Sequence, residues 1–210
     1  NYSNAVVIES SVNDFDKEIS CKKQLLEKLL NEHPDTDWIF WMDGDTLLDG
    51  RLLRNEAQEI KMMLNAASSQ GIDILTLGHY NLWRSDIFYR VDTDYDWLHN
   101  NGVKAFWRNN GDLSFPDNSG LHQPQHPLGL KTEARVDRNL IHRGFATEQQ
   151  ILTRYNLYKS KGQKGYLLDR LIDEKNLSVV EIDKKQLPDW FQINDAENPI
   201  FKKTLINKNE

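Results

Sequence analysis

The stretch Trp38-Ile39-Phe40-Trp41-Met42-Asp43-Gly44-Asp45 indicates the fold more strongly than any other part of this 210-residue chain. Five apolar residues precede two acidic ones, a pattern typical of a buried strand that ends at a polar site. Another apolar run, Ala5 to Ile8, comes earlier, and leucines at helical spacing lie between the two runs. The order strand, helix, strand predicts a βαβ unit.

Further elements follow the same alternation. Leu52 to Ala67 has helical character, and Ile72 to Leu77 is a third apolar run, followed by the polar segment Gly78 to Asn81, which we interpret as a loop. A later helix is expected to begin at Thr147, with Gln150 placed to complete a capping box. We therefore expect an α/β fold with a mixed, mainly parallel sheet flanked by helices.

Composition narrows the classes of function. The net charge of −6 argues against a general nucleic-acid binder, which usually carries a basic patch. The single cysteine, Cys21, excludes an intramolecular disulfide and a cysteine-based zinc site, and a reducing, cytoplasmic setting fits best. We find no apolar stretch of roughly 18 residues, so no transmembrane segment is expected, although work at a membrane face stays possible.

The acidic residues at the end of the Trp38 strand suggest a metal site. Ligands gather at the C-terminal ends of strands in open α/β sheets. Asp43 and Asp45 lie two apart, so on an extended chain both carboxylates point the same way. Hard carboxylate oxygens suit Mg²⁺ or Mn²⁺, and phosphate oxygens usually complete the shell of such an ion. A nucleotide diphosphate is therefore the expected partner of the metal, with a solvated acidic turn as the alternative.

The segment from His33 to Leu48 resembles the DXD region of GT-A glycosyltransferases, both family-two enzymes and the group with the motif W-x-W-x-D-x-D. The resemblance implies a GT-A (Rossmann-like) fold in which Asp43 and Asp45 hold a divalent metal on a nucleotide-sugar diphosphate. It also implies that Glu9, after the first apolar run, contacts the base or ribose of the nucleotide; a plain loop acid is the alternative. Such folds usually open with a strand upstream of Ala5 to Ile8, so we expect either that this strand lies outside the numbered chain or that the sheet opens differently.

A second segment, Leu140 to Phe145, resembles the "HYG" element of bacterial and viral family-two-like transferases. In those enzymes a helix with the pattern K/R-Y-x-x-Y-K follows, and here Arg154 to Lys159 matches it. The resemblance implies that His142 is a further metal ligand, and an imidazole favours Mn²⁺ over Mg²⁺. A structural histidine is the alternative. Arg143 is a candidate for contact with the diphosphate, with an ordinary surface arginine as the alternative.

The catalytic base is the least defined part of the site. Related transferases carry a "V-H-E" element whose glutamate activates the acceptor hydroxyl, but here Gln123 stands at that position and an amide cannot take a proton. His122 and Asp117 are the preferred candidates, and Glu133 and Asp137 are the others.

The sequence therefore predicts a hexosyl- or deoxyhexosyltransferase that moves a sugar from a nucleotide-diphosphate donor to a glycan or other hydroxyl acceptor. The family-two resemblance implies inversion at the sugar. Residues 1–187 would form the catalytic domain and residues 188–210 a C-terminal arm. Two alternatives stay open. A metal-dependent nucleotidyl or phosphoryl transferase would need a glycine-rich basic loop, which we do not find. A non-catalytic carbohydrate-binding domain would explain Gln123.

Overall fold

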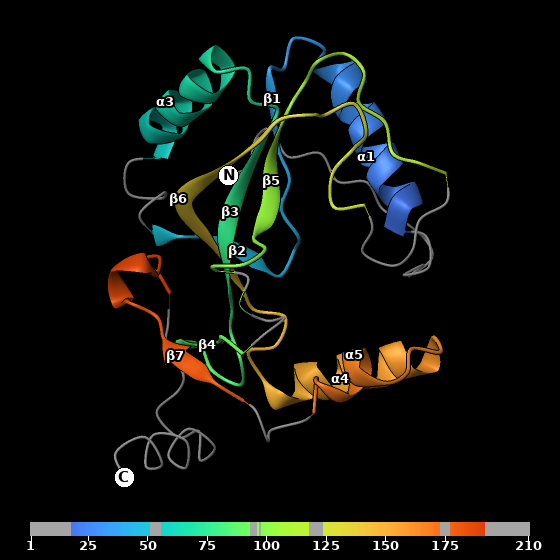
Figure 1. The fold of residues 1–210 in the computed structure, drawn as a ribbon, viewed down its shortest axis with the longest axis vertical. Helices are drawn as coiled ribbons and strands as arrows, with labels where there is room; N and C mark the ends of the chain where they lie inside the picture. Colours follow the sequence, from blue (N-terminus) through green and yellow to red (C-terminus); the bar gives the residue numbers. More distant parts are fainter. Residues whose placement is uncertain are drawn as a thin grey trace. The chain divides into compact units, whose positions relative to one another are not determined.

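The computed structural model describes residues 18–50, 56–92, 96, 98–117, 124–172 and 177–191 (Figure 1). The predicted first strand, Ala5 to Ile8, therefore lies outside the described residues, as do Glu9, His122 and Gln123. The predicted C-terminal arm is described only for residues 188–191.

Helices and strands are interspersed along the described chain. In order, they are α1 (Glu18–Glu32), β1 (Trp38–Phe40), β2 (Thr46–Leu48), α3 (Glu56–Ser69), β3 (Ile74–Asn81), β4 (Phe88–Arg90), β5 (Val103–Arg108), β6 (Glu133–His142), α4 (Glu148–Ser160), α5 (Tyr166–Asp169), β7 (Val179–Glu181) and the 3₁₀ turn η3 (Lys184–Gln186). Five strands form one sheet in the order β1-β5-β3-β6-β2, and β4 pairs with β7 in a separate two-stranded sheet. The expected α/β class, with a mixed sheet and flanking helices, is confirmed.

The directions of the strands differ from the expected mainly parallel arrangement. β1 pairs antiparallel with β5, and β2 pairs antiparallel with β6. β3 and β6 run in the same direction, because the amide of Ile74 donates to the carbonyl of Thr132 at one end and that of Leu82 donates to His142 at the other. The apolar pattern indicates which residues are buried, but it does not encode the direction of the neighbouring strand.

The strand that precedes the acidic residues is shorter and less buried than predicted. β1 ends at Phe40, and within it Ile39 is buried (4% exposed) while Phe40 is 38% exposed. Met42, expected at the end of a buried strand, is 41% exposed. The aromatic rings pack on those of β5, with Phe40 stacked on Phe106 at 4.6 Å between centroids. This alternation is typical of an antiparallel strand with one covered face.

β3 is longer than predicted. All eight of its residues are buried, including the segment Gly78 to Asn81 that we interpreted as a loop. Its polar side chains lie beside other polar groups: Asn139 Nδ2 donates to the Tyr80 hydroxyl at 3.0 Å, and Asn81 Oδ1 lies 3.0 Å from His142 Nδ1. Buried polar groups are tolerated where such partners exist, so polarity alone did not mark the end of this strand.

The chain forms two compact units. The described residues of unit 1 fall within 1–41, 67–75 and 104–134, and those of unit 2 fall within 42–66, 76–103 and 135–210. Unit 1 has a core of Leu26, Ile39, Trp107 and Phe115. Unit 2 has two clusters, one around Trp83 and Ile151 and one around Leu82 and Ile141. Among the described helices, none has both the length and the apolar character required to span a membrane.

Candidate functional site

The candidate site is centred on Asp45 in unit 2. Asp43 to Thr46 forms a β-turn, in which the amide of Thr46 donates to the carbonyl of Asp43 at 3.1 Å. β2 begins at Thr46, which pairs in register with His142 at the end of β6. The amide of Arg143 also donates to the carbonyl of Asp45 at 2.8 Å. These backbone contacts place Asp45 beside the last residue of β6.

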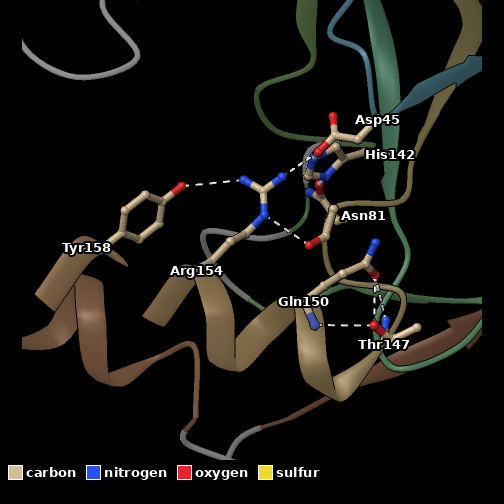
Figure 2. A network of polar contacts seen from close by, with 8 residues as sticks. Asp45, Asn81, His142, Thr147, Gln150, Arg154 and Tyr158 are labelled. Carbon is tan, nitrogen blue, oxygen red and sulfur yellow. Dashed lines mark hydrogen bonds and ion pairs between the residues drawn. The ribbon is translucent and has the colours of Figure 1, made fainter. Parts of the chain in front are cut away.

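Two basic side chains meet the carboxylate of Asp45. Arg154 donates from Nη2 to Oδ2, and His142 Nε2 lies 3.2 Å from the same oxygen (Figure 2). The three side chains are only partly exposed, at 33% for Asp45, 26% for Arg154 and 12% for His142. Asp45 and Arg154 are 109 positions apart in the sequence. The two segments that the sequence analysis singled out therefore come together at one carboxylate.

This environment determines the charge of Asp45. Burial raises the pKa of the Asp45 carboxyl, but the hydrogen bond and charge of His142, together with the charge of Arg154, outweigh burial. The pKa consequently falls from 3.8 to about 2. Asp45 is thus an anion at every pH at which the protein would work, as a metal ligand must be.

Asn81, on β3, fixes the orientation of His142. The distance from His142 Nδ1 to Asn81 Oδ1 is 3.0 Å, and because this amide oxygen can only accept, Nδ1 carries the proton. A neutral His142 then points the Nε2 lone pair at Asp45 Oδ2, which is also an acceptor. Two acceptors 3.2 Å apart require a cation, either a second proton on the imidazole or a metal ion. An outer partner of this kind is typical of metal-binding histidines.

A second histidine lies against the first. The rings of His79 and His142 are 5.0 Å apart between centroids, and His79 is 8% exposed. Burial, together with the neighbouring His142, holds the pKa of His79 well below 6.5, although Asp45 acts in the opposite direction. His79 therefore contributes a neutral ring to the wall behind His142.

Arg154 lies on α4, whose start is fixed by a cap. The helix is capped by Thr147, whose side chain accepts from the Gln150 amide while the Gln150 side chain accepts from the Thr147 amide, so the predicted capping box is confirmed (Figure 2). The guanidinium also donates from Nε to the carbonyl of Gly144 at 3.0 Å and lies 5.0 Å from the centre of the Phe145 ring. Arg154 therefore has anchors besides Asp45.

Gly144 leaves room for this convergence. A Cβ at this position would lie 2.5 Å from His142 Nε2 and 2.7 Å from Asp45 Oδ2, and closer still to the guanidinium of Arg154. Real Cβ atoms do not approach other atoms so closely. The absence of a side chain at Gly144 is therefore a steric requirement of the site, and it accounts for the glycine in the "HYG"-like segment.

Within the described residues, the side chains of the other predicted site residues make no hydrogen bond or ion pair with the Asp45 carboxylate. Asp43 is exposed, and its carboxylate has no hydrogen bond or ion pair with any described residue. Arg143 donates from Nη2 to Asp86 at 3.0 Å, and its guanidinium lies 5.1 Å from the centre of the Phe191 ring. Asp117 belongs to unit 1, where it is 94% exposed and pairs with Lys23.

The groups around Asp45 fit a divalent ion with few protein ligands. In octahedral coordination by Mg²⁺ or a similar ion, adjacent ligands are about 3 Å apart, close to the 3.2 Å between Asp45 Oδ2 and His142 Nε2. The described parts of the chain contain no group of three or more His, Cys, Asp or Glu that could hold a metal. Two protein ligands suffice where phosphate and water complete the shell. Asp45 and His142 would hold the ion.

Two residues of this group were not assigned to the site from the sequence. The sequence places Arg154 in a helical motif, and its position about two turns after the capped start of α4 is the available signal. Asn81 follows the predicted third strand in a polar segment, and no sequence pattern indicates that it faces His142.

Comparison with known proteins gives no relative. No family model matches the chain, and no curated protein or solved structure matches it significantly. Function must therefore be argued from the site itself.

Proposed function

We propose that this chain is a divalent-metal-dependent glycosyltransferase of the GT-A kind, which moves a sugar from a nucleotide-diphosphate donor to a hydroxyl acceptor. One observation carries the proposal. The second acid of the DXD-like segment, the histidine of the "HYG"-like segment and the arginine of the following helix meet at a single carboxylate oxygen. The resemblance of those segments to transferases implies that they share one metal site, and their contacts at Asp45 support the proposal.

The residues of the chain have distinct roles in this proposal. Asp45 and His142 hold Mn²⁺ or Mg²⁺, with Asp43 on the exposed side of the turn as a further carboxylate. When bound, such an ion neutralises the charge that develops on the diphosphate leaving group. Asn81 keeps the His142 ring in the orientation that metal binding needs. The acceptor base stays a prediction, with His122 and Asp117 as candidates and inversion as the expected outcome.

Calorimetry with UDP and GDP, with and without Mn²⁺, tests the proposal. We expect Mn²⁺-dependent binding of one nucleoside diphosphate, lost in Asp45→Asn and retained in Asp112→Asn, a matched change at an exposed aspartate of unit 1. Absence of any Mn²⁺-dependent binding would refute the proposal. Preference for a free triphosphate would instead favour phosphoryl or nucleotidyl transfer.

Turnover distinguishes an enzyme from a binding domain. A transferase should slowly hydrolyse its nucleotide sugar when no acceptor is present, because water can replace the acceptor hydroxyl. Release of nucleoside diphosphate from a panel of UDP- and GDP-sugars, measured with Mn²⁺, should therefore be detectable and should disappear in Asp45→Asn. Tight binding without release from any donor would favour the non-catalytic carbohydrate-binding domain.

A further inference from the structure

Arg154 occupies the position that the proposed metal would need. Its Nη2 donates to Asp45 Oδ2, the oxygen that also faces His142 Nε2. Arg154, His142 and Asp45 all lie so close to Gly144 that a Cβ at this position would overlap each of them. A guanidinium and a divalent ion are both cations directed at one oxygen, so they cannot occupy this position together.

The remaining contacts of Arg154 do not depend on Asp45. Its Nε donates to the carbonyl of Gly144, its guanidinium lies against the Phe145 ring, and its Nη1 lies 3.5 Å from the Tyr158 hydroxyl. Phe145 is 8% exposed and belongs to a core cluster of unit 2, so it is a fixed support. A small rotation of the guanidinium releases Asp45 while these supports keep Arg154 at the site.

We propose that Arg154 is an exchangeable cation of the site: it neutralises Asp45 when no metal is bound, gives up Oδ2 to the divalent ion, and then binds the diphosphate of the donor. This inference rests on the proposed function. The planar fork of a guanidinium matches two phosphate oxygens as well as it matches a carboxylate. The carboxylate of Asp45 offsets part of the positive charge of a bound divalent ion. The charge that is left does not neutralise a diphosphate, so a second cation beside the phosphates is favourable.

The inference predicts changes of opposite sign in two binding measurements. Arg154→Gln removes the competitor for Asp45, so the variant should bind Mn²⁺ alone about fivefold more tightly than the unmodified protein, the effect expected of a partly exposed ion pair. In saturating Mn²⁺, the same variant should bind nucleoside diphosphate roughly tenfold more weakly, because one charged hydrogen-bond partner of the phosphate is lost.

Two control variants separate this effect from a general change. Lys159→Gln removes one positive charge from the same helix, in contact with Tyr155 rather than with Asp45, and should change neither affinity. Arg154→Lys keeps the charge but loses the fork, so its diphosphate affinity should lie between those of the unmodified protein and Arg154→Gln. Circular dichroism checks that each variant is folded.

Side-chain NMR of the unmodified protein provides a test that needs no variant. Titration with Mg²⁺, a diamagnetic ion, should shift the Arg154 Nε–H resonance as the guanidinium leaves Asp45. Unchanged or weaker Mn²⁺ binding by Arg154→Gln, or an Arg154 resonance that ignores saturating Mg²⁺, would overturn the inference while leaving the glycosyltransferase proposal standing. Conversely, if Mn²⁺ binds with the predicted pattern but no nucleoside diphosphate does, the proposed function fails and the competition between Arg154 and metal remains.

Discussion

Replacing Gly144 with alanine tests the geometry of the site most directly. The new methyl group would lie 2.5 Å from His142 Nε2 and 2.7 Å from Asp45 Oδ2, and would also overlap the guanidinium of Arg154. All three are ends of side chains, so the backbone can stay in place while the polar groups separate. Gly144→Ala should therefore leave a folded protein whose Arg154–Asp45 and His142–Asp45 contacts are broken.

The size of the effect follows from three contributions. Overpacking of a closed position costs about 1–3 kcal/mol. Loss of the partly exposed ion pair between Arg154 and Asp45 costs about 1 kcal/mol. Alanine also restricts the unfolded chain, which returns about 0.4–1 kcal/mol, since Gly144 has no positive φ that alanine would resist. The net loss in free energy of unfolding should be about 2 kcal/mol.

Urea unfolding followed by circular dichroism measures this loss, and titration with Mn²⁺ measures its consequence for the site. Gly44→Ala is the matched control, because Gly44 lies in the turn beside Asp45 and a Cβ there meets nothing within 4 Å. The control should unfold within about 0.5 kcal/mol of the unmodified protein, as surface substitutions usually do. If Gly144→Ala were as stable as Gly44→Ala and bound Mn²⁺ equally well, the convergence at Gly144 would be refuted.

Three further predictions follow from the same contacts. Asn81→Ala frees His142 Nδ1 and should weaken Mn²⁺ binding by roughly tenfold or more in calorimetry; an unchanged affinity would show that the ring needs no outer partner. The pKa of Asp45 is lowered from 3.8 to about 2, so its ionised form stabilises the fold above pH 3.8, and that stability is lost as the pH falls towards 2. Urea unfolding at pH 5 and pH 2 should show this loss, about 1 kcal/mol after allowance for solvent screening, and Asp45→Asn should lose that much less; equal acid sensitivity would contradict the assignment. Thr147→Ala breaks the capping box with Gln150 and should cost about 1 kcal/mol in thermal or urea unfolding, with Gln149→Ala as the control; equal stability of the two would mean that α4 does not depend on its cap.

The sequence predicted well those features that depend on neighbours along the chain. The capping box at Thr147 is local, because it needs only suitable side chains three residues apart, and both of its hydrogen bonds are present. The helices α1 and α3 and the strand β3 were also predictable from apolar spacing. Asp45 and His142 are predicted site residues because each lies in a motif with a distinct chemical character, and the structure brings their side chains together.

Features that depend on distant parts of the chain were not predictable from the pattern. β1 and β2 find antiparallel partners in β5 and β6, and no local signal specifies such a choice. The polar end of β3 is buried because Asn81 contacts a histidine that follows much later in the sequence. An extended chain is expected at Asp43 and Asp45, but a β-turn forms there, and the side chain of Asp45 contacts His142 and Arg154 from distant parts of the chain.

Because Thr46 pairs with His142, the contact between Asp45 and His142 depends on the correct register of β2 against β6. Asp45 immediately precedes β2, and Arg143 immediately follows β6, so each residue of slippage between the two strands would shift the carboxylate along the strand by about 3.3 Å relative to the imidazole. A slip by one residue would also turn alternate side chains to the opposite face of the sheet. Metal affinity should consequently be lost in misaligned chains that keep their helices, and length changes in loops that leave this pairing intact should be tolerated by the site.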